Sequence, residues 1–146
     1  FRSDEVSSLQ KWEPSRENLD DRWLDLAIEK NDLALVMALA RSNHKPTQKF
    51  LKKTFDEVIV KSDWNWYGLH IVSTMFEIDS PDATACLMKV LPKFQKNDVS
   101  VNWWFEQILP KAGLETAEAI EAIIPKLSEH TVDALVPYLS DMKART

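Results

Sequence analysis

Glycine is almost missing from this chain, which has only Gly68 and Gly113 among its 146 residues. Glycine supplies the positive-φ residues of two-residue β-hairpins, and it lets the backbone of phosphate- and dinucleotide-binding loops approach a ligand closely. Two glycines leave little material for any of these structures. Because helices need glycine only at some of their ends, this scarcity favours an all-α fold.

The chain is long enough and apolar enough to bury a core. Hydrophobic residues make up 45% of it and six residues are tryptophan, which argues against intrinsic disorder. Its length suits one domain of ordinary size. The longest wholly apolar run, Leu33 to Ala40, is far shorter than the ~20 residues that span a bilayer, so we expect no membrane partner.

The net charge of −5 is unevenly distributed. Residues 41–61 hold six basic and two acidic groups, whereas the segments on both sides are acidic. A nucleic-acid-binding protein usually presents a dominant basic face, so nucleic acid is an unfavoured partner. The local basic patch consists of Lys45, Lys49, Lys52 and Lys53. A solvated lysine face is the simpler interpretation, and contact with an acidic partner is the alternative.

Cysteine usage bears on the compartment. Cys86 is the single cysteine, so no disulfide can form within the chain. We therefore expect a reducing, cytoplasmic location, although an exported protein without disulfides has the same composition. No signal peptide is visible, and the first residue is Phe1 rather than methionine, so we expect the chain to be part of a longer one.

A pair of antiparallel helices between Asp63 and Phe94 is the most clearly marked element. Its turn contains Ser80, Pro81 and Asp82, which are typical of an N-cap, a first helical position and a favourable dipole charge. The first helix of the pair carries two apolar stripes that cover about half of its circumference. Such a helix needs packing neighbours on two sides, which indicates a stack of helices.

The same signals predict the other helices, about eight in all. We expect them over residues 16–30, 33–40, 47–60, 116–128 and 131–142, with a further one that starts at Asp98 or Ser100 and runs to Lys111, after a short peripheral segment at 1–18. The expected N-caps are Asp32, Thr47, Asp63, Thr116 and Thr131. Gly113 is expected to end a helix in the left-handed conformation. The last helix is expected to bury Val132, Leu135, Val136, Leu139 and Met142.

Tryptophan-headed helix pairs recur along the chain. They begin at Trp23, Trp66 and Trp103, at intervals of 43 and 37 residues. A second repeated feature is an apolar residue followed by proline: Leu91-Pro92, Leu109-Pro110, Ile124-Pro125 and Val136-Pro137. The period and the two-helix unit resemble HEAT or armadillo-like repeats, and divergent bacterial HEAT-like proteins in particular, whose period is ~40–47 residues.

The resemblance covers the chain from about Ser15 onward. It implies a single helical-repeat domain over 1–146, in which antiparallel helix pairs stack as a right-handed superhelix. The implied repeat units are 15–41, 47–95 and 99–142, with the predicted helix at 47–60 as an additional element. It also implies scaffolding or protein–protein binding, usually without catalysis. We therefore expect an interaction or scaffold module, not an enzyme, with no cofactor.

Tryptophan placement supplies the candidate binding residues. Trp66 falls on the polar side of its predicted helix, and Trp103 takes the matching repeat position, away from its own apolar arc. The polar side around Trp66 also holds His70, Ser73, Thr74 and Glu77. Exposed aromatic residues on a repeat surface are candidate anchors for a partner, so Trp66, His70 and Trp103 are candidate binding residues. Packing against an adjacent repeat is the more common alternative.

Two other functions stay open. Lys49 and Lys52 are candidate contacts to nucleic acid, which some HEAT-like proteins bind. A small-ligand or catalytic site around His70 would use Ser73 and Glu77, although three neighbours on one exposed helical face are far more often solvated polar residues.

The histidines do not predict a metal site. His44, His70 and His130 have no metal-ligand spacing among themselves, and Cys86 cannot complete a structural zinc site locally. Cys86 lies on the apolar face of its predicted helix and is expected to be a buried hydrophobic residue. We therefore expect no metal.

Overall fold

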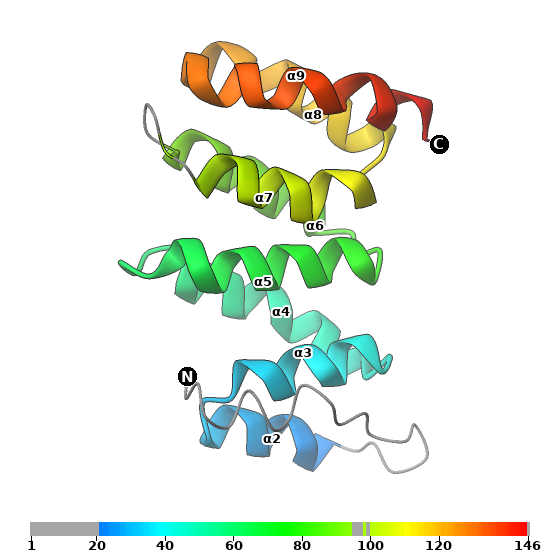
Figure 1. The fold of residues 1–146 in the computed structure, drawn as a ribbon. Coiled ribbons are helices and arrows are strands. Elements are labelled where there is room, and N and C mark those ends of the chain that lie inside the picture. The colour runs from blue at the N-terminus through cyan, green and yellow to red at the C-terminus, as the bar shows by residue number, and fades with distance from the viewer. Residues whose placement is uncertain (1–20, 95–97, 99, 146) are drawn as a thin grey trace. The chain divides into compact units, whose positions relative to one another are not determined.

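The computed structural model describes residues 21–94, 98 and 100–145, and most of them lie in helices joined by short turns. These residues form eight α-helices and three 3-10 turns, with no strand among them, so the all-α prediction is confirmed. The predicted segment at 1–18 and the predicted helix start at Arg16 lie outside the described residues. The chain divides into two compact units, Phe1–Glu57 and Val58–Thr146. Figure 1 shows the helices in chain order.

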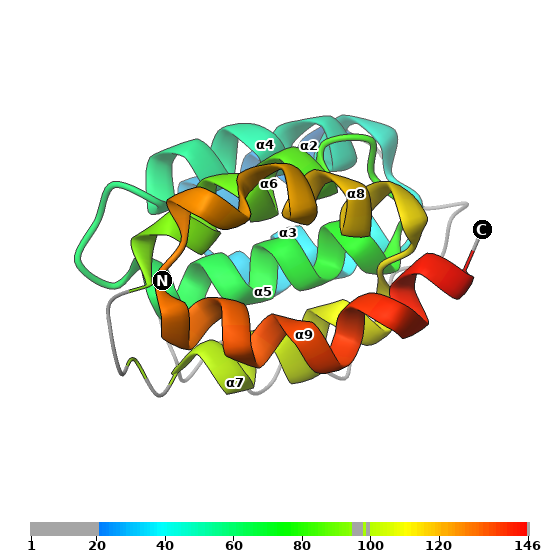
Figure 2. The same cartoon turned by 90° about the horizontal axis from the view of Figure 1, so that it is seen from above.

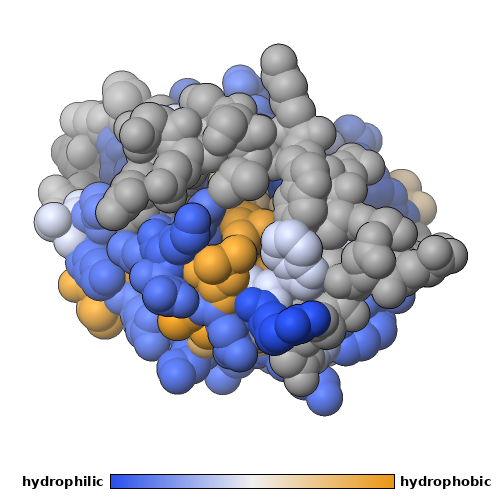
Figure 3. Space-filling view, turned by 90° about the horizontal axis from the view of Figure 1, so that it is seen from below, coloured by the Kyte–Doolittle hydropathy of each residue, from blue (hydrophilic) through white to orange (hydrophobic). Residues whose placement is uncertain are grey.

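The first unit contributes α2 (Asp21–Glu29), α3 (Leu33–Arg41) and most of α4 (Lys45–Val58). Asp32 caps α3 as predicted, because its Oδ1 accepts a hydrogen bond of 3.1 Å from the backbone N–H of Leu35. The apolar run in α3 is almost entirely buried. Seen from the side on which α2 lies, the described surface is mainly hydrophilic, with apolar side chains gathered near its centre (Figure 3).

The predicted N-cap of α4 is wrong. The helix begins at Lys45, so Thr47 lies inside its first turn, where it is buried with its Oγ1 2.6 Å from His44 Nδ1. Asn43 adopts a positive φ of 67°, and Gln48 Nε2 donates to the carbonyl of Ala40 at 2.8 Å. Because of this tight turn, the helix begins two residues before Thr47.

The second unit holds five α-helices. They are α5 (Trp64–Glu77), α6 (Ala83–Val90), α7 (Ser100–Ile108), α8 (Leu114–Ile123) and α9 (Glu129–Ala144). They form two rows, with α5, α7 and α9 in one and α6 and α8 in the other (Figure 2). The chain alternates between the rows, and each helix packs on the next helix of its own row.

Proline explains where three of these helices end. Leu91–Lys93, Leu109–Lys111 and Ile124–Lys126 are 3-10 turns that directly follow α6, α7 and α8, each with proline at its second position. Proline has no N–H to continue the α-helical hydrogen bonding. The fourth apolar-proline pair behaves differently, because Pro137 lies inside α9.

Several predicted helix ends are wrong. α8 begins at Leu114, so Thr116 lies inside it, and Ser128 rather than Thr131 caps α9 by accepting from the Thr131 N–H at 3.2 Å. Gly113 has a φ of −127° and precedes α8, so it is not a left-handed stop. Its neighbour Leu114 donates to the carbonyl of Arg145, which fixes the chain entry into α8.

Other caps are partly as predicted. Asp63 takes the N-cap position of α5, but its carboxylate makes no capping hydrogen bond. α6 begins at Ala83 rather than at Pro81, and Ser80 Oγ instead accepts from the N–H of Asp82 at 3.2 Å. The turn before it contains Asp79 at a φ of 55°. The extra turn residues delay the helix by two positions.

An aromatic cluster forms the core of the second unit. Trp104 is fully buried, with ring centres 6.0 Å from Trp64 and 5.7 Å from Phe94. Phe105 lies 6.2 Å from Phe94 and 6.4 Å from Tyr138, with the rings edge to face in both pairs. Such pairs stabilise by roughly 0.5–1.5 kcal/mol beyond burial alone. The cluster joins α5, α7 and α9.

Gly68 lies in the middle of α5 against this cluster. A Cβ at this position would lie 3.4 Å from Trp104 Cη2, which is ordinary contact. Alanine is favoured over glycine inside a helix by roughly 0.5–1 kcal/mol, so we expect Gly68→Ala to stabilise the second unit by that amount in urea unfolding. A destabilised Gly68→Ala variant would show that the indole cannot accept the methyl group.

Candidate functional site

Asn65 ties the first turn of α5 to α7. Its Nδ2 donates to Ser100 Oγ at 2.7 Å, and its Oδ1 accepts from the indole N–H of Trp104. Ser100 Oγ in turn donates to Asp98 Oδ1 at 2.6 Å, and His130 Nε2 of α9 lies 3.1 Å from the Asp98 carbonyl oxygen. This chain of hydrogen bonds holds the beginnings of α5, α7 and α9 in a defined register.

Neighbouring helices of a row are parallel, because contacts join their beginnings to each other and their ends to each other. Asn65 and Trp104 are 39 residues apart in sequence, and Ser73 and Lys111, joined by a hydrogen bond of 2.9 Å, are 38 apart. These separations agree with the interval of 37 between Trp66 and Trp103. In the other row, the Thr84 and Thr116 hydroxyls are 2.8 Å apart and 32 residues apart in sequence. Equivalent helices therefore stack side by side.

The three candidate binding residues Trp66, His70 and Trp103 lie together. The Trp66 and Trp103 rings stack with centres 5.3 Å apart and an interplanar angle of 27°. The imidazole of His70 meets both indoles edge to face, at 5.0 Å from Trp66 and 6.4 Å from Trp103. Trp66 is 55% exposed, whereas Trp103 and His70 are half-buried.

Val136 of α9 is a further exposed apolar side chain. Its exposure was not predicted from the sequence. The side chain is 58% exposed, although the helical wheel predicted it to be buried. The wheel assigned too wide an apolar arc to α9, which packs on α7 and α8. Phe105 of α7 contacts Tyr138 of α9, a separation of 33 residues. The same separation makes Val136 the counterpart of Trp103, so we name Trp66, Trp103 and Val136 the apolar row.

The other side chains around Trp66 differ from one another. Thr74, predicted to lie on the polar side, is buried. Glu77 is exposed. Ser73 Oγ accepts a hydrogen bond from Lys111 Nζ. Among the described residues, Ser73 makes no hydrogen bond to His70. The arrangement is a structural link between α5 and η3 (Leu109–Lys111).

Burial lowers the pKa of His70 from its ordinary value of 6.5. A lowered pKa means that the unfolded state takes up the proton first, so folding loses stability as the pH falls below 6.5 and through the folded-state value. We expect the free energy of unfolding to be lower at pH 5.5 than at pH 7.5 in the native chain. The difference between the two pH values is expected to be smaller in His70→Gln. Equal losses in both proteins would show that His70 does not contribute.

The lysines of α4 form a separate surface on the first unit. Lys45, Lys49, Lys52 and Lys53 are all exposed, and Lys53 Nζ lies 5.8 Å from the centre of the Phe50 ring. Asp56 and Glu57 follow on the same helix and are also exposed. Nucleic-acid binding by Lys49 and Lys52 stays a prediction.

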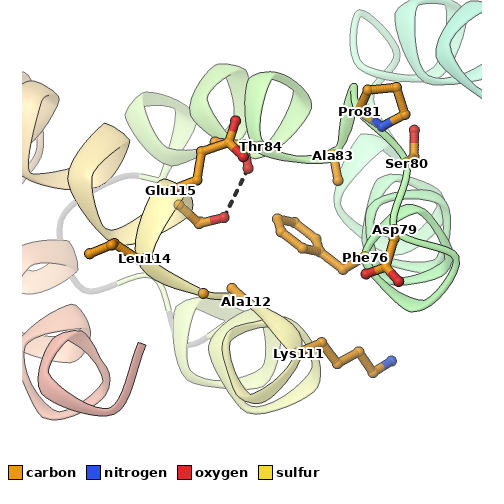
Figure 4. Close-up of a pocket in the computed structure, with 12 residues that line it drawn as sticks. Phe76, Asp79, Ser80, Pro81, Ala83, Thr84, Lys111, Ala112, Leu114 and Glu115 are labelled. Carbon is orange, nitrogen blue, oxygen red and sulfur yellow. Dashed lines mark hydrogen bonds between the residues drawn. The ribbon is translucent and has the colours of Figure 1, made fainter. Parts of the chain in front are cut away.

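A pocket of about 500 Å³ opens in the second unit between the α5–α6 turn and the start of α8 (Figure 4). The Phe76 ring points into it, and the hydrogen-bonded pair Thr84 and Thr116 lies on its far side. The charged lining residues are of both signs: Asp79, Lys111 and Glu115. Sequence reasoning did not anticipate this pocket, because it forms from two turns far apart in the chain.

No group of three or more His, Cys, Asp or Glu side chains within the described ranges is arranged to hold a metal ion. No helix among the same residues combines the length and apolar character needed to cross a membrane. Cys86 is buried on α6, as predicted.

Comparison with known proteins gives no relative. No protein-family model, no curated protein and no solved structure matches the chain.

Proposed function

We propose that this chain is a non-catalytic module for protein–protein interaction or scaffolding, and that its partner binds on the apolar row. The HEAT or armadillo-like superhelix is part of the proposal. It is supported by the parallel stacking of equivalent helices at separations of 32 to 39 residues within the second unit. Successive repeats of one helix pair produce this kind of packing. A cytoplasmic location, expected from the cysteine content, belongs to the same proposal.

The stacked pair of Trp66 and Trp103 carries the proposal. Tryptophan is the residue type most enriched in binding hot spots, because it buries a large apolar area at a partner surface. Here the indoles are held by each other and by His70 before any partner arrives. Less side-chain freedom is then lost on binding, which raises affinity.

The apolar row runs across three neighbouring helices, α5, α7 and α9. Trp66, Trp103 and Val136 occupy equivalent positions on α5, α7 and α9, and the hydrogen bonds through Asn65 and Asp98 fix those helices at their beginnings. A partner lying across the row would contact one apolar side chain per helix. Repeat proteins commonly bind partners along such a continuous surface.

A peptide-display selection tests the proposal. The immobilised chain is presented with a library of random 16-residue peptides, and the bound peptides are then compared on the Trp66→Ala/Trp103→Ala variant. We expect most selected peptides to lose binding to the variant, because binding surfaces with exposed, ordered aromatic residues dominate such selections. Selected peptides that bind both proteins equally, or a selection that yields no binder, would contradict the proposal.

A further inference from the structure

An acidic side chain lies three residues from each member of the apolar row. Asp63, Glu106 and Asp133 are exposed, and each lies three residues from Trp66, Trp103 and Val136, respectively. Residues three apart on a helix lie on the same face. Neither α5 nor α7 contains a lysine or an arginine. The surface around the row is therefore both apolar and acidic.

The basic groups that follow α7 and that lie at the C-terminal end of α9 are already engaged. Lys111 Nζ donates to Ser73 Oγ, and Lys143 Nζ forms a salt bridge of 2.9 Å with Glu121. The Arg145 guanidinium donates to the carbonyl oxygens of Leu109 and Ala112 at 3.0 and 2.8 Å. By contrast, the three carboxylates beside the row have no ion-pair partner among residues 21–94, 98 and 100–145.

An indole face next to a carboxylate attracts a cation. Cation–π attraction is strongest for tryptophan, and a guanidinium can stack on the ring while it donates hydrogen bonds in its own plane. The second unit already contains one such contact, because Lys93 Nζ lies 5.1 Å from the centre of the Trp64 ring. The lowered pKa of His70 leaves its imidazole uncharged at neutral pH, so it does not repel a cation.

We propose that the partner is a segment of another polypeptide in which arginine stands beside apolar side chains. The guanidinium lies on the Trp66 and Trp103 indoles within reach of Asp63 and Glu106, and an apolar side chain covers Val136. Charge complementarity selects a basic peptide here, whereas the same carboxylates repel the phosphates of nucleic acid. This inference rests on the proposed function, since it names the partner chemistry of the same surface.

The composition of the selected peptides tests the inference. Among peptides that need Trp66 and Trp103, we expect enrichment of arginine at one position. Changing that arginine to citrulline, which keeps the shape but loses the charge, is expected to weaken binding about tenfold, as loss of a partly desolvated cation–π and ion-pair contact predicts. Glu106→Lys on the chain is expected to weaken binding by a similar factor.

Glu118→Lys is the matched control, because Glu118 is an exposed carboxylate on α8, in the other row. We expect it to change the affinity less than about twofold, as is usual for an exposed charge outside an interface. Tryptophan-dependent peptides without arginine enrichment, or citrulline peptides that bind equally well, would overturn the inference and leave the proposed function intact. Peptides that ignore both tryptophans would overturn the proposed function itself.

Discussion

Replacing Trp104 with alanine is expected to cost the second unit about 3–5 kcal/mol of stability. The ring is fully buried and packs against Trp64 of α5 and Phe94, so its removal leaves a cavity in the aromatic cluster. Its indole N–H also satisfies Asn65 Oδ1, which would be left without this donor. Since domains are stable by only about 5–15 kcal/mol, the loss is a large fraction of the total.

Urea unfolding followed by circular dichroism measures this cost. Trp104→Phe is the matched variant, because it keeps a buried aromatic ring but loses the N–H, and its expected cost of about 1–3 kcal/mol combines the lost hydrogen bond to Asn65 with the smaller ring. Trp66→Ala is the exposed control, expected to cost about 1 kcal/mol through the lost stacking on Trp103. Trp104→Ala and Trp66→Ala variants of equal stability would contradict the described core.

The combined Trp66→Ala/Trp103→Ala substitution is expected to weaken partner binding at least about a hundredfold. Two hot-spot residues that each contribute about 2 kcal/mol sum to roughly a thousandfold, and because contributions of contacting hot-spot residues are not additive, about a hundredfold is the lower bound. The fold is expected to survive, because Trp66 is largely exposed and Trp103 is half-buried. Isothermal titration with a selected peptide gives the affinity, and the melting temperature of the same sample shows that the variant is folded.

Val136→Ala serves as a graded control for this prediction. It removes less apolar area than either tryptophan, so we expect a weakening of only about tenfold or less at an unchanged melting temperature. If the combined Trp66→Ala/Trp103→Ala substitution leaves the affinity unchanged, the peptide binds elsewhere than on the apolar row. The lysines of α4 and the pocket beside Phe76 would then be the next surfaces to examine.

Local sequence signals predicted much of the fold. The near absence of glycine predicted the helical class, and the Asp32 cap and the burial of α3 are as expected. The 37-residue interval predicted that Trp66 and Trp103 take matching repeat positions, and the structure adds that their rings stack on each other. These features depend on nearby residues or on simple repetition, which a sequence displays directly.

Features that depend on tertiary contacts were missed. The cap at Thr116 failed because Leu114 bonds to Arg145, far along the chain. The cap at Thr131 failed for a local reason, because Ser128 three residues earlier accepts from the Thr131 N–H. Asn65 carries no signal by itself, yet its two hydrogen bonds position the aromatic pair. The boundary between Glu57 and Val58 falls inside α4, where no helix-breaking residue marks it. A single domain over 1–146 stays a prediction.

Mapping the bound peptide on the chain tests the central proposal most directly. A selected peptide is titrated into the isotope-labelled protein, and the indole N–H signals of Trp66 and Trp103 and the backbone amide of Val136 are followed by NMR. We predict that these three signals shift with the largest amplitudes, while the amide of Glu118 on α8 does not move. Shifts confined to Lys49 and Lys52, or to Phe76 and its pocket, would contradict the proposal that the apolar row is the binding surface.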